Sequence, residues 1–366
     1  MIVRDEERML SSCLESVHGL FDELIVVDTG SSDRTMEIAH SNGARVIEVP
    51  WTDDFSAARN VSLAMATGNY AFWIDADDVV EPQERVKLKA ILDELSVGDE
   101  CAYVMRCASD RNMASPLIAD HIRLFPLSLD IRWVYPVHEQ ILPSLESAGV
   151  PVRRTDITIR HRGYADARAK ERKRKRDWNI LRRHLLSSPN DSFVLYNLGI
   201  IVFERKRWPE ALEYFRRSLV NVSNLDGTAP FRRKLFSMLA WTHQVMGNLE
   251  DSVRMCNMGL AIDPQDAELL FRKAVGYRYR GRTAEAVACW NQILTVSRRE
   301  SVTSIDEGIY GHLTRRNLAI IAEERGDHAE ASIQWHAVLA ECPGDVDATQ
   351  RLATKSGAYE RKTAHS

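Results

Sequence analysis

Strand-like segments are confined to the first 165 residues of this chain, and helix-forming sequence fills the remainder. In the first part, short apolar runs alternate with amphipathic stretches, which is typical of a parallel sheet covered by helices. In the second part the apolar residues recur with a helical period, so these helices must bury their apolar faces against one another. We therefore expect two domains, over residues 1–165 and 166–366, in agreement with a length of 366 residues.

The first domain opens with three expected strands that are separated by helices. The strands share apolar runs and cover residues 24–27, 44–49 and 69–74. The linking helices are expected over residues 35–43 and 53–68, each closed by a glycine. In open parallel sheets, ligands bind beyond the carboxyl ends of the strands. Asp28 and Asp75 stand at two such ends, which predicts a binding site there.

The sequence pattern of residues 100–165 is typical of antiparallel strands, which would extend the domain beside the parallel sheet. Four strand-like segments are expected at residues 101–107, 115–125, 130–136 and 156–164. A short helix is expected over residues 138–149. The fold class is therefore an α/β domain followed by an all-α region.

The helical region contains an internal repeat. Gly281 lies 34 residues after Gly247, and both begin a similar segment, which is the period of tetratricopeptide repeats. Ala211 and Ala331 occupy the small-residue position of two further copies, so about four helix pairs are expected. The wider spacing of the outer copies predicts insertions at residues 221–230 and 297–308.

Charge and composition exclude several classes of protein. The formal net charge is −4, which argues against a general nucleic-acid binder, and the basic stretch at residues 168–186 is interpreted as a solvated helix that links the domains. The six cysteines form no C-x-x-C pair, which favours a reducing, cytoplasmic location. The start of the sequence is acidic rather than typical of a signal peptide, and no run approaches the roughly 18 apolar residues of a membrane span.

Acidic residues cluster after the third expected strand. Asp75 and Asp77 flank Ala76, so both carboxylates can face one small volume where the strand leaves the sheet. Carboxylate oxygens suit Mg²⁺ or Mn²⁺, which bind a few carboxylates together with substrate phosphates. A simpler interpretation is a solvated acidic turn before a helix that starts near Pro82.

Two ordered motifs carry a resemblance to a known family. The sequence VVDTGSSDRT at residues 26–35 is followed by WTDDFSAARNVSLAMATGNYAFWIDADD at residues 51–78. Together they resemble the family 2 glycosyltransferases, which have the Rossmann-like GT-A fold of nucleotide-diphospho-sugar transferases. The resemblance covers residues 1–164, and the repeats point to the branch that includes the peptide S-glycosyltransferases of glycocin biosynthesis. The resemblance implies transfer of a sugar to an acceptor with inversion, and a UDP-sugar is the first choice of donor.

The resemblance also implies roles for individual residues. Asp28 would contact the uracil or ribose, Asp77 would bind the metal, and Asp75 would contact the ribose or sugar or bind the metal as well. The remaining donor-pocket residues implied are Val3, Arg4, Arg59, Asn60 and Ala76. Relatives have more apolar residues before Val3, so the first strand is short here or the native start lies upstream.

The acceptor side of the resemblance supplies the general base. An inverting transferase needs a base that deprotonates the acceptor across the sugar from the diphosphate. Glu139 is the predicted base, with His138 as its neighbour or alternate, because an Arg-Leu-Phe motif is followed by a His-Glu pair expected to open a helix. The alternative is that Glu139 only stabilises the helix amino terminus.

Other residues of this half are candidates for related roles. His161 resembles a position near the metal or diphosphate, as an alternative to a structural histidine. The further candidates for base, phosphate contact or apolar platform are His121, Asp130, Arg123 and Trp133.

Three functional hypotheses follow from the sequence. In the first, a transferase acts on a peptide or protein held by the repeats, or on a polysaccharide or lipid-linked acceptor, and the repeats alternatively mediate a homodimer. In the second, the repeats are a scaffold and the first domain is a degenerate transferase that only binds nucleotide. A nucleotidyltransferase is disfavoured, because the sequence MIVRDEERML has no Gly-rich phosphate loop.

Overall fold

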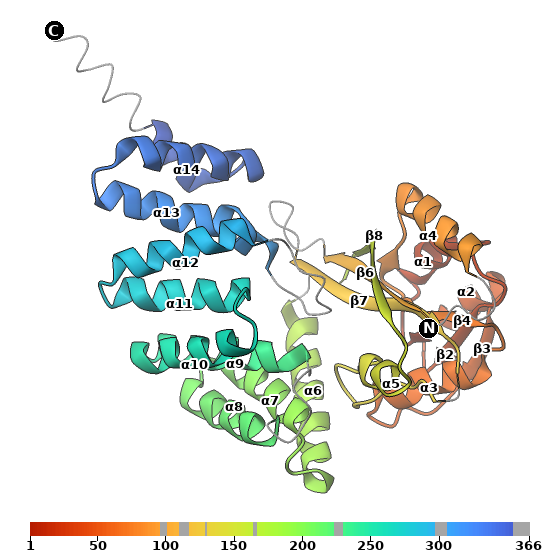
Figure 1. Cartoon of the computed structure of the whole chain (residues 1–366). Helices are drawn as coiled ribbons and strands as arrows, with labels where there is room; N and C mark the ends of the chain where they lie inside the picture. The colour runs from red at the N-terminus through yellow and green to blue at the C-terminus, as the bar shows by residue number, and fades with distance from the viewer. Residues whose placement is uncertain are drawn as a thin grey trace. The chain divides into compact units, whose positions relative to one another are not determined.

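The computed structural model describes residues 1–95, 101–109, 117–128, 130–163, 167–222, 230–296 and 306–353. The described residues form two compact units that divide between Pro189 and Asn190. The first unit holds the strands β1–β8 and the helices α1–α6, and the second holds the helices α7–α14 (Figure 1). The sequence places the domain boundary near residue 165, whereas the contacts group helix α6 (Ala167–Ser187) with the first unit.

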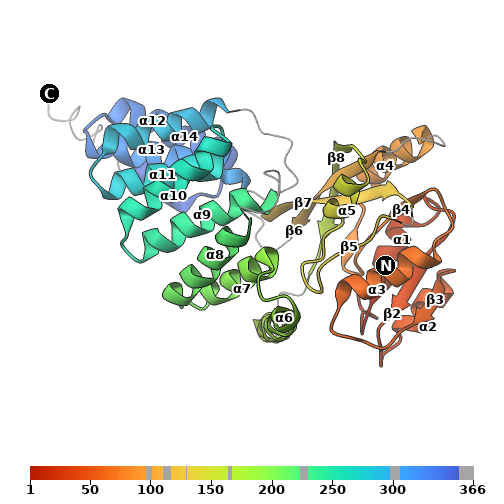
Figure 2. The ribbon, with the colours of Figure 1, turned by 60° about the horizontal axis from the view of Figure 1, so that its bottom comes forward.

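A parallel three-stranded sheet begins the first unit. Its strands are β1 (Ile2–Val3), β2 (Ile25–Asp28) and β3 (Arg45–Glu48), in that order. The helices that alternate with them are α1 (Leu10–Val17), α2 (Thr35–Ser41) and α3 (Phe55–Met65). Figure 2 shows α3 running beside β2. Asp54 caps α3 by accepting a hydrogen bond from the backbone N–H of Ala57 at 2.9 Å, which fixes where this helix begins.

A mixed five-stranded sheet completes the first unit. Its strands, in spatial order, are β4 (Tyr70–Phe72), β7 (Leu117–Pro126), β6 (Ala102–Ser109), β8 (Val152–His161) and β5 (Asp78–Val79). Strands β6 and β8 are parallel and the other pairs are antiparallel. The third expected strand therefore forms, but its placement in the parallel sheet is wrong. Its ladder partner is β7, with Phe72 opposite Leu124, and an apolar run does not reveal which neighbour a strand takes.

Two expectations for residues 130–149 are also wrong. Residues 130–136 form no regular strand, because the side-chain amide of Asn60 satisfies the backbone N–H and C=O of Trp133, and only Val134 makes an isolated bridge, to Gln140. The helix begins at residue 142 rather than 138, since Gln140 is held in that bridge; it is α5 (Leu142–Ser147). Helix α4 (Pro82–Glu94) begins at Pro82, as predicted.

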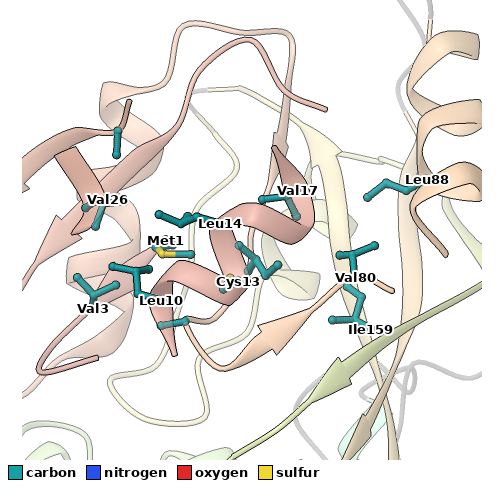
Figure 3. Packing of buried hydrophobic residues seen from close by; sticks show 14 of the residues in the cluster. Met1, Val3, Leu10, Cys13, Leu14, Val17, Val26, Val80, Leu88 and Ile159 are labelled. Carbon is teal, nitrogen blue, oxygen red and sulfur yellow. The ribbon is translucent and has the colours of Figure 1, made fainter. Parts of the chain in front are cut away.

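One hydrophobic core joins the two sheets of the first unit. Figure 3 shows Leu10, Cys13 and Leu14 of α1 packed together with residues from both sheets. The core includes Val26 of the parallel sheet and Ile159 of the mixed sheet, both fully buried. Each buried aliphatic side chain contributes about 1.5–3 kcal/mol relative to an exposed one, so this cluster holds the strand ends in a fixed relation.

The second unit is a stack of helix pairs. The pairs are α7 (Ser192–Glu204) with α8 (Trp208–Val222), α9 (Pro230–Val245) with α10 (Leu249–Ile262), α11 (Ala267–Tyr279) with α12 (Thr283–Thr295), and α13 (His312–Glu324) with α14 (His328–Glu341). A 3-10 helix, η1 (Glu307–Tyr310), precedes α13. The pairs lie one after another along the unit (Figure 1), which confirms the predicted repeat architecture. The predicted insertions lie mostly outside the described residues.

The repeat is visible in equivalent positions of the four pairs. The turn before the second helix of each pair has one residue with a left-handed backbone: Lys206, Gly247, Gly281 and Gly326. The fourth residue of each second helix is small and fully buried: Ala211, Ser252, Ala286 and Ala331. Trp290 and Trp335 share a further buried position, whereas Trp208 and Trp241 are only partly buried. Small side chains allow the paired helices to approach closely, which explains the spacing that the sequence repeats.

Within the described ranges, no helix combines the length and the apolar character that crossing a bilayer requires.

Candidate functional site

A cavity of about 520 Å³ lies in the first unit beyond the ends of several strands. Val3 is the last residue of β1, Thr29 comes directly after β2, and the segment Asp75–Asp77 lies between β4 and β5. The predicted site residues that line it are Val3, Arg4, Arg59, Asp75, Ala76, Asp77, His138, Glu139 and His161. The cavity therefore brings together donor-side and acceptor-side candidates from both ends of the domain.

Arg59 of α3 joins two carboxylates of the cavity. Its Nη2 atom donates to Asp75 Oδ1 at 2.9 Å, and its Nε atom donates to Glu139 Oε1 at 2.7 Å. The guanidinium is buried between two indole rings, 4.4 Å from the centroid of Trp73 and 5.0 Å from that of Trp133. Charge-assisted bonds on both sides of a stacked guanidinium leave it little freedom. Arg59 thus fixes Glu139 relative to Asp75.

The ion pairs of Arg59 determine the charge of the Asp75 carboxyl and of the Arg59 guanidinium. Burial alone would raise the pKa of the Asp75 carboxyl, but the positive charges of Arg59 and Arg123 outweigh it and hold that pKa well below its ordinary range. Burial would lower the pKa of Arg59, and Asp75 and Glu139 reverse that effect, so the pKa is raised. Asp75 is therefore an anion and Arg59 a cation throughout the physiological range.

A second cluster lies at the other end of the aspartate segment. Asp77, Asp78 and His161 offer one ligand atom each within 4.8 Å of one another. His161 Nδ1 lies 3.0 Å from Asp78 Oδ1 and 3.4 Å from Asp77 Oδ1. The hydrogen bond that His161 donates to Asp78 raises the pKa of His161, and burial raises the pKa of Asp77 although His161 opposes the shift. A bound cation would lower both pKa values, because it favours the deprotonated form of each ligand.

Asp78 is the most tightly engaged member of the cluster. It is fully buried, and its Oδ2 atom accepts from Arg123 at 2.8 Å and from the backbone N–H of Asp75 at 3.0 Å. Arg123 also stacks on Trp73, with its guanidinium carbon 3.8 Å from the ring centroid. Arg123 is therefore committed to the interior and does not line the cavity, which removes the predicted phosphate contact.

The donor set fits a divalent cation held by Asp77 and His161. Asp75 and Asp78 have oxygen atoms bound to guanidinium groups, whereas Asp77 forms no ion pair in the described part of the chain except with His161. Mg²⁺ and Mn²⁺ bind through one or two protein ligands and take the rest from phosphates and water. The predicted residues Asp75, Asp77 and His161 thus lie around one cavity, and Asp77, Asp78 and His161 have ligand atoms close enough together to hold a metal ion.

Asp28 does not line the cavity, although it ends β2 as expected. Its Oδ1 atom accepts hydrogen bonds from the backbone N–H groups of Gly30 and Ser31, both at 2.8 Å, and thereby shapes the turn. Its Oδ2 atom is buried and has no hydrogen-bond partner among the described residues. Buried acceptors in folded proteins usually have a hydrogen-bond partner, so Oδ2 of Asp28 is an exception.

His138 and Glu139 precede α5 rather than opening it. The helix-terminus alternative for Glu139 therefore does not apply, since α5 starts at Leu142. Glu139 is largely buried, with Oε1 bound to Arg59. His138 has a left-handed backbone, with φ of 58°, and its side chain lies at the cavity. Desolvation by the surrounding protein lowers the pKa of His138.

Two of the remaining candidates, Asn60 and Trp133, make contacts with other residues of the domain interior. Asn60 braces Trp133 through two hydrogen bonds, at 2.8 and 2.9 Å, and does not line the cavity. Trp133 lines the cavity but also packs against Trp73, with ring centroids 5.1 Å apart. His121 lines it as well, and burial lowers its pKa to about 4, while Asp130 lies outside it.

The sequence did not predict several residues that line the cavity. Of the lining residues, Phe55 falls in an expected helix, Trp73 and Asp120 fall in expected strands, and Trp51 lies between an expected strand and helix. Lys173, Arg176 and Asp177 of α6 come from the basic stretch interpreted as a solvated linker. Their spacing of three and four residues puts them on one face of the helix, but the sequence does not show what that face meets.

Comparisons with known proteins agree with this geometry. Residues 1–132 match the family model described as glycosyl transferase family 2. A TPR repeat-containing protein of Synechococcus elongatus is 34% identical over 227 residues, which cover 60% of this chain and 55% of that protein. The SPbeta prophage-derived glycosyltransferase SunS of Bacillus subtilis is 25% identical over 243 residues, which cover 63% and 55% of the two chains. The chain thus spans about half the length of these relatives.

Solved structures resemble the chain more loosely. MamA has a TM-score of 0.38 at 14% identity, covering 49% of this chain and 96% of that one. A thermophilic TPR protein of Thermus thermophilus has a TM-score of 0.37 at 20% identity, covering 51% and 92%.

The first unit therefore contains a segment of the glycosyltransferase type over residues 1–132, and a tetratricopeptide-like array of helix pairs follows it. The motifs at residues 26–35 and 51–78 lie within the part of the chain that matches glycosyl transferase family 2, as they predict.

Proposed function

We propose that this chain transfers a sugar from a nucleoside-diphospho-sugar, with UDP as the first choice of nucleotide, to an acceptor with inversion at the anomeric carbon. The observation that carries the proposal is the cavity itself. It joins the family's aspartate motif at Asp75–Asp77 to a carboxylate, Glu139, that comes from the other half of the domain. A transferase needs both parts, one for the leaving diphosphate and one for the attacking acceptor.

Asp77 and His161 are the proposed ligands of a Mg²⁺ or Mn²⁺ ion, with Asp75 beside them. When bound, the ion neutralises charge on the diphosphate as the glycosidic bond breaks. Val3, Arg4 and Ala76 line the same cavity and are proposed to contact the nucleotide. Asp28 supplies its buried acceptor to the base or ribose.

Glu139 is the proposed general base, with His138 as its alternate. Arg59 binds Oε1 of Glu139, which leaves Oε2 to take the proton of the acceptor as it attacks. The same guanidinium binds Asp75, so the base keeps a fixed position relative to the donor end of the cavity. Such positioning lowers the entropic part of the barrier.

A peptide or protein is the proposed acceptor, and a polysaccharide or lipid-linked acceptor is the second choice. Stacked helix pairs give an extended surface that suits an extended chain, and one relative carries the name glycosyltransferase SunS.

Homodimer formation through the array is a further proposal. A cytoplasmic location is proposed because all six cysteines are free.

A donor screen tests the proposal. The full chain is incubated with a panel of nucleoside-diphospho-sugars, with Mn²⁺, with Mg²⁺ or with chelator, and release of nucleoside diphosphate is measured. We expect metal-dependent release for at least one donor, and faster release when an acceptor peptide is present. Binding of nucleoside diphosphate without any release, whatever acceptor is offered, would instead support a scaffold with a degenerate domain.

A further inference from the structure

Helix α6 follows the last strand of the first unit and contributes three side chains to the cavity. Lys173, Arg176 and Asp177 line it together with Asp77 and Glu139. The family match ends at residue 132, so these residues lie beyond the part of the chain that the family model describes. Their spacing puts them on one helix face, which is the face turned toward the cavity.

Two contacts hold this helix to the glycosyltransferase fold. Arg183 pairs with Asp53 at 2.6 Å, just before α3. The guanidinium of Arg176 stacks 4.6 Å from the ring centroid of Phe55, and it also binds Asp177 Oδ1 through two nitrogen atoms at 2.8 and 3.0 Å. Asp177 is buried, so this pairing is shielded from solvent. Arg176 is therefore engaged on both sides and fixes α6 beside the cavity.

The charges of the cavity favour a further cation when the diphosphate leaves the sugar. Its carboxylates are Glu6, Asp75, Asp77, Asp120, Glu139 and Asp177, of which Asp120 pairs with Arg154 outside the cavity. The diphosphate of a bound sugar donor carries two negative charges, and the released nucleoside diphosphate carries about three at neutral pH, so a divalent ion leaves about one charge of the released diphosphate unpaired. Of the cavity's basic side chains, Arg59 and Arg176 are committed to carboxylates, and Arg4 lies 4.0 Å from Asp5.

Lys173 and Arg4 are the two basic side chains of the cavity that no buried carboxylate holds, and Lys173 is the one supplied by α6. It forms no hydrogen bond or ion pair within the part of the chain that the structure describes, and it is exposed at the cavity. We propose that Lys173 is an additional donor-binding residue, whose ammonium group binds the diphosphate of the nucleoside-diphospho-sugar. A flexible, strongly hydrated ammonium is suited to this role, because it can follow a phosphate group as the donor binds and as the diphosphate leaves. This inference rests on the proposed function and extends the donor site to α6.

Binding measurements on the full chain test the inference. Nucleoside diphosphates are first screened by calorimetry with Mn²⁺, and the tightest is compared with its nucleoside, measured by ligand-observed NMR. Lys173→Gln should weaken the diphosphate about tenfold, as expected for one lost charge-assisted contact, and should leave the nucleoside unchanged. Lys173→Arg should restore most of the affinity.

Lys175→Gln is the matched control. Lys175 is exposed on the same helix and does not line the cavity, so its loss removes an equal charge elsewhere. Equal diphosphate affinity in Lys173→Gln and Lys175→Gln overturns the inference and leaves the proposed function intact. Equal weakening of nucleoside and diphosphate in Lys173→Gln also overturns it, since the residue would then be structural. Absence of binding of every nucleoside diphosphate to the unmodified chain overturns both.

Discussion

The two units bury different kinds of side chain at their structural centres. In the repeat unit the recurring buried positions are small or aromatic, as Ala286 and Trp290 show in one pair and Ala331 and Trp335 in another. In the glycosyltransferase unit two arginines, Arg59 and Arg123, are buried beside Trp73. Buried ion pairs contribute little net stability compared with apolar packing, because desolvation of the charges offsets their attraction.

The buried side chains therefore have different roles in the two units. In the repeats they stabilise the packing of the helices, and in the first unit the buried arginines position carboxylates of the cavity. Each repeat contributes a similar amount of stability through its own packing and that of its neighbours. The buried arginines instead connect Asp75, Asp78 and Glu139, so they determine where carboxylates of the cavity lie. Changes at the cavity residues of the first unit should therefore alter activity or the pH response, and changes at the buried positions of the repeats should alter stability.

The largest effect is expected for Glu139→Gln. Loss of the base should lower turnover by about 10²- to 10⁴-fold, while the amide still accepts the hydrogen bond from Arg59 and donor affinity changes little. Steady-state kinetics and calorimetry on the same preparation separate the two quantities. Glu146→Gln, on the exposed side of α5, is the control. A parallel loss of donor affinity would assign Glu139 to the structure of the cavity instead.

Arg123→Met tests the buried ion pair itself. Removal of the guanidinium leaves Asp78 buried without its charge partner and should cost about 3–5 kcal/mol of unfolding free energy. Lys89→Met, which breaks an exposed pair with Asp93 at 2.9 Å on α4, should cost less than about 1 kcal/mol. Chemical denaturation of both variants measures the contrast. Similar costs for the two variants would show that burial does not distinguish them.

His121 predicts a pH dependence of the first unit. Burial lowers its pKa from 6.5 to about 4 in the folded chain, so the unfolded chain binds the proton more readily. The associated stability is complete above pH 6.5 and is lost as the pH falls toward 4, by up to about 3 kcal/mol. His121→Phe should flatten the profile of unfolding free energy in this window. Profiles of equal slope for both proteins would refute the assignment to His121.

The smallest effect is expected in the repeat unit. Lys206 has a left-handed backbone, with φ of 60°, at the turn position where the other three pairs have glycine. Lys206→Gly should relieve this strain and raise the unfolding free energy by about 0.5–1 kcal/mol, with activity unchanged. Lys206→Ala keeps the strain and should be neutral. Thermal unfolding of the two variants side by side checks the prediction.

Local patterns in the sequence predicted the parts of the fold that depend on local interactions. The expected start of α4 at Pro82, the helix pairs 34 residues apart and the aspartates after the strands all follow from capping, periodicity and strand-end signals. The family motifs at residues 26–35 and 51–78 then predicted the class of domain, which the family match confirms.

Long-range partners could not be predicted in the same way. The pairing of β4 with β7 depends on which strand edge is available, and the apolar run at residues 70–72 is compatible with either sheet. Asn60 braces Trp133 across 73 residues, and nothing near Asn60 indicates this partner. The basic stretch of α6 has the composition of a solvated helix, and only the fold places Lys173 at the cavity.

The most direct test of the account is the metal dependence of nucleoside-diphosphate binding in the unmodified chain and in Asp77→Asn. Calorimetry with and without Mn²⁺ should show that the ion strengthens binding to the unmodified chain and has little effect on the variant, because Asp77 is a proposed ligand of the ion and belongs to the cluster that could hold it. Equal strengthening by Mn²⁺ in both proteins would contradict a metal site at Asp77 and, with it, the proposed use of the cavity.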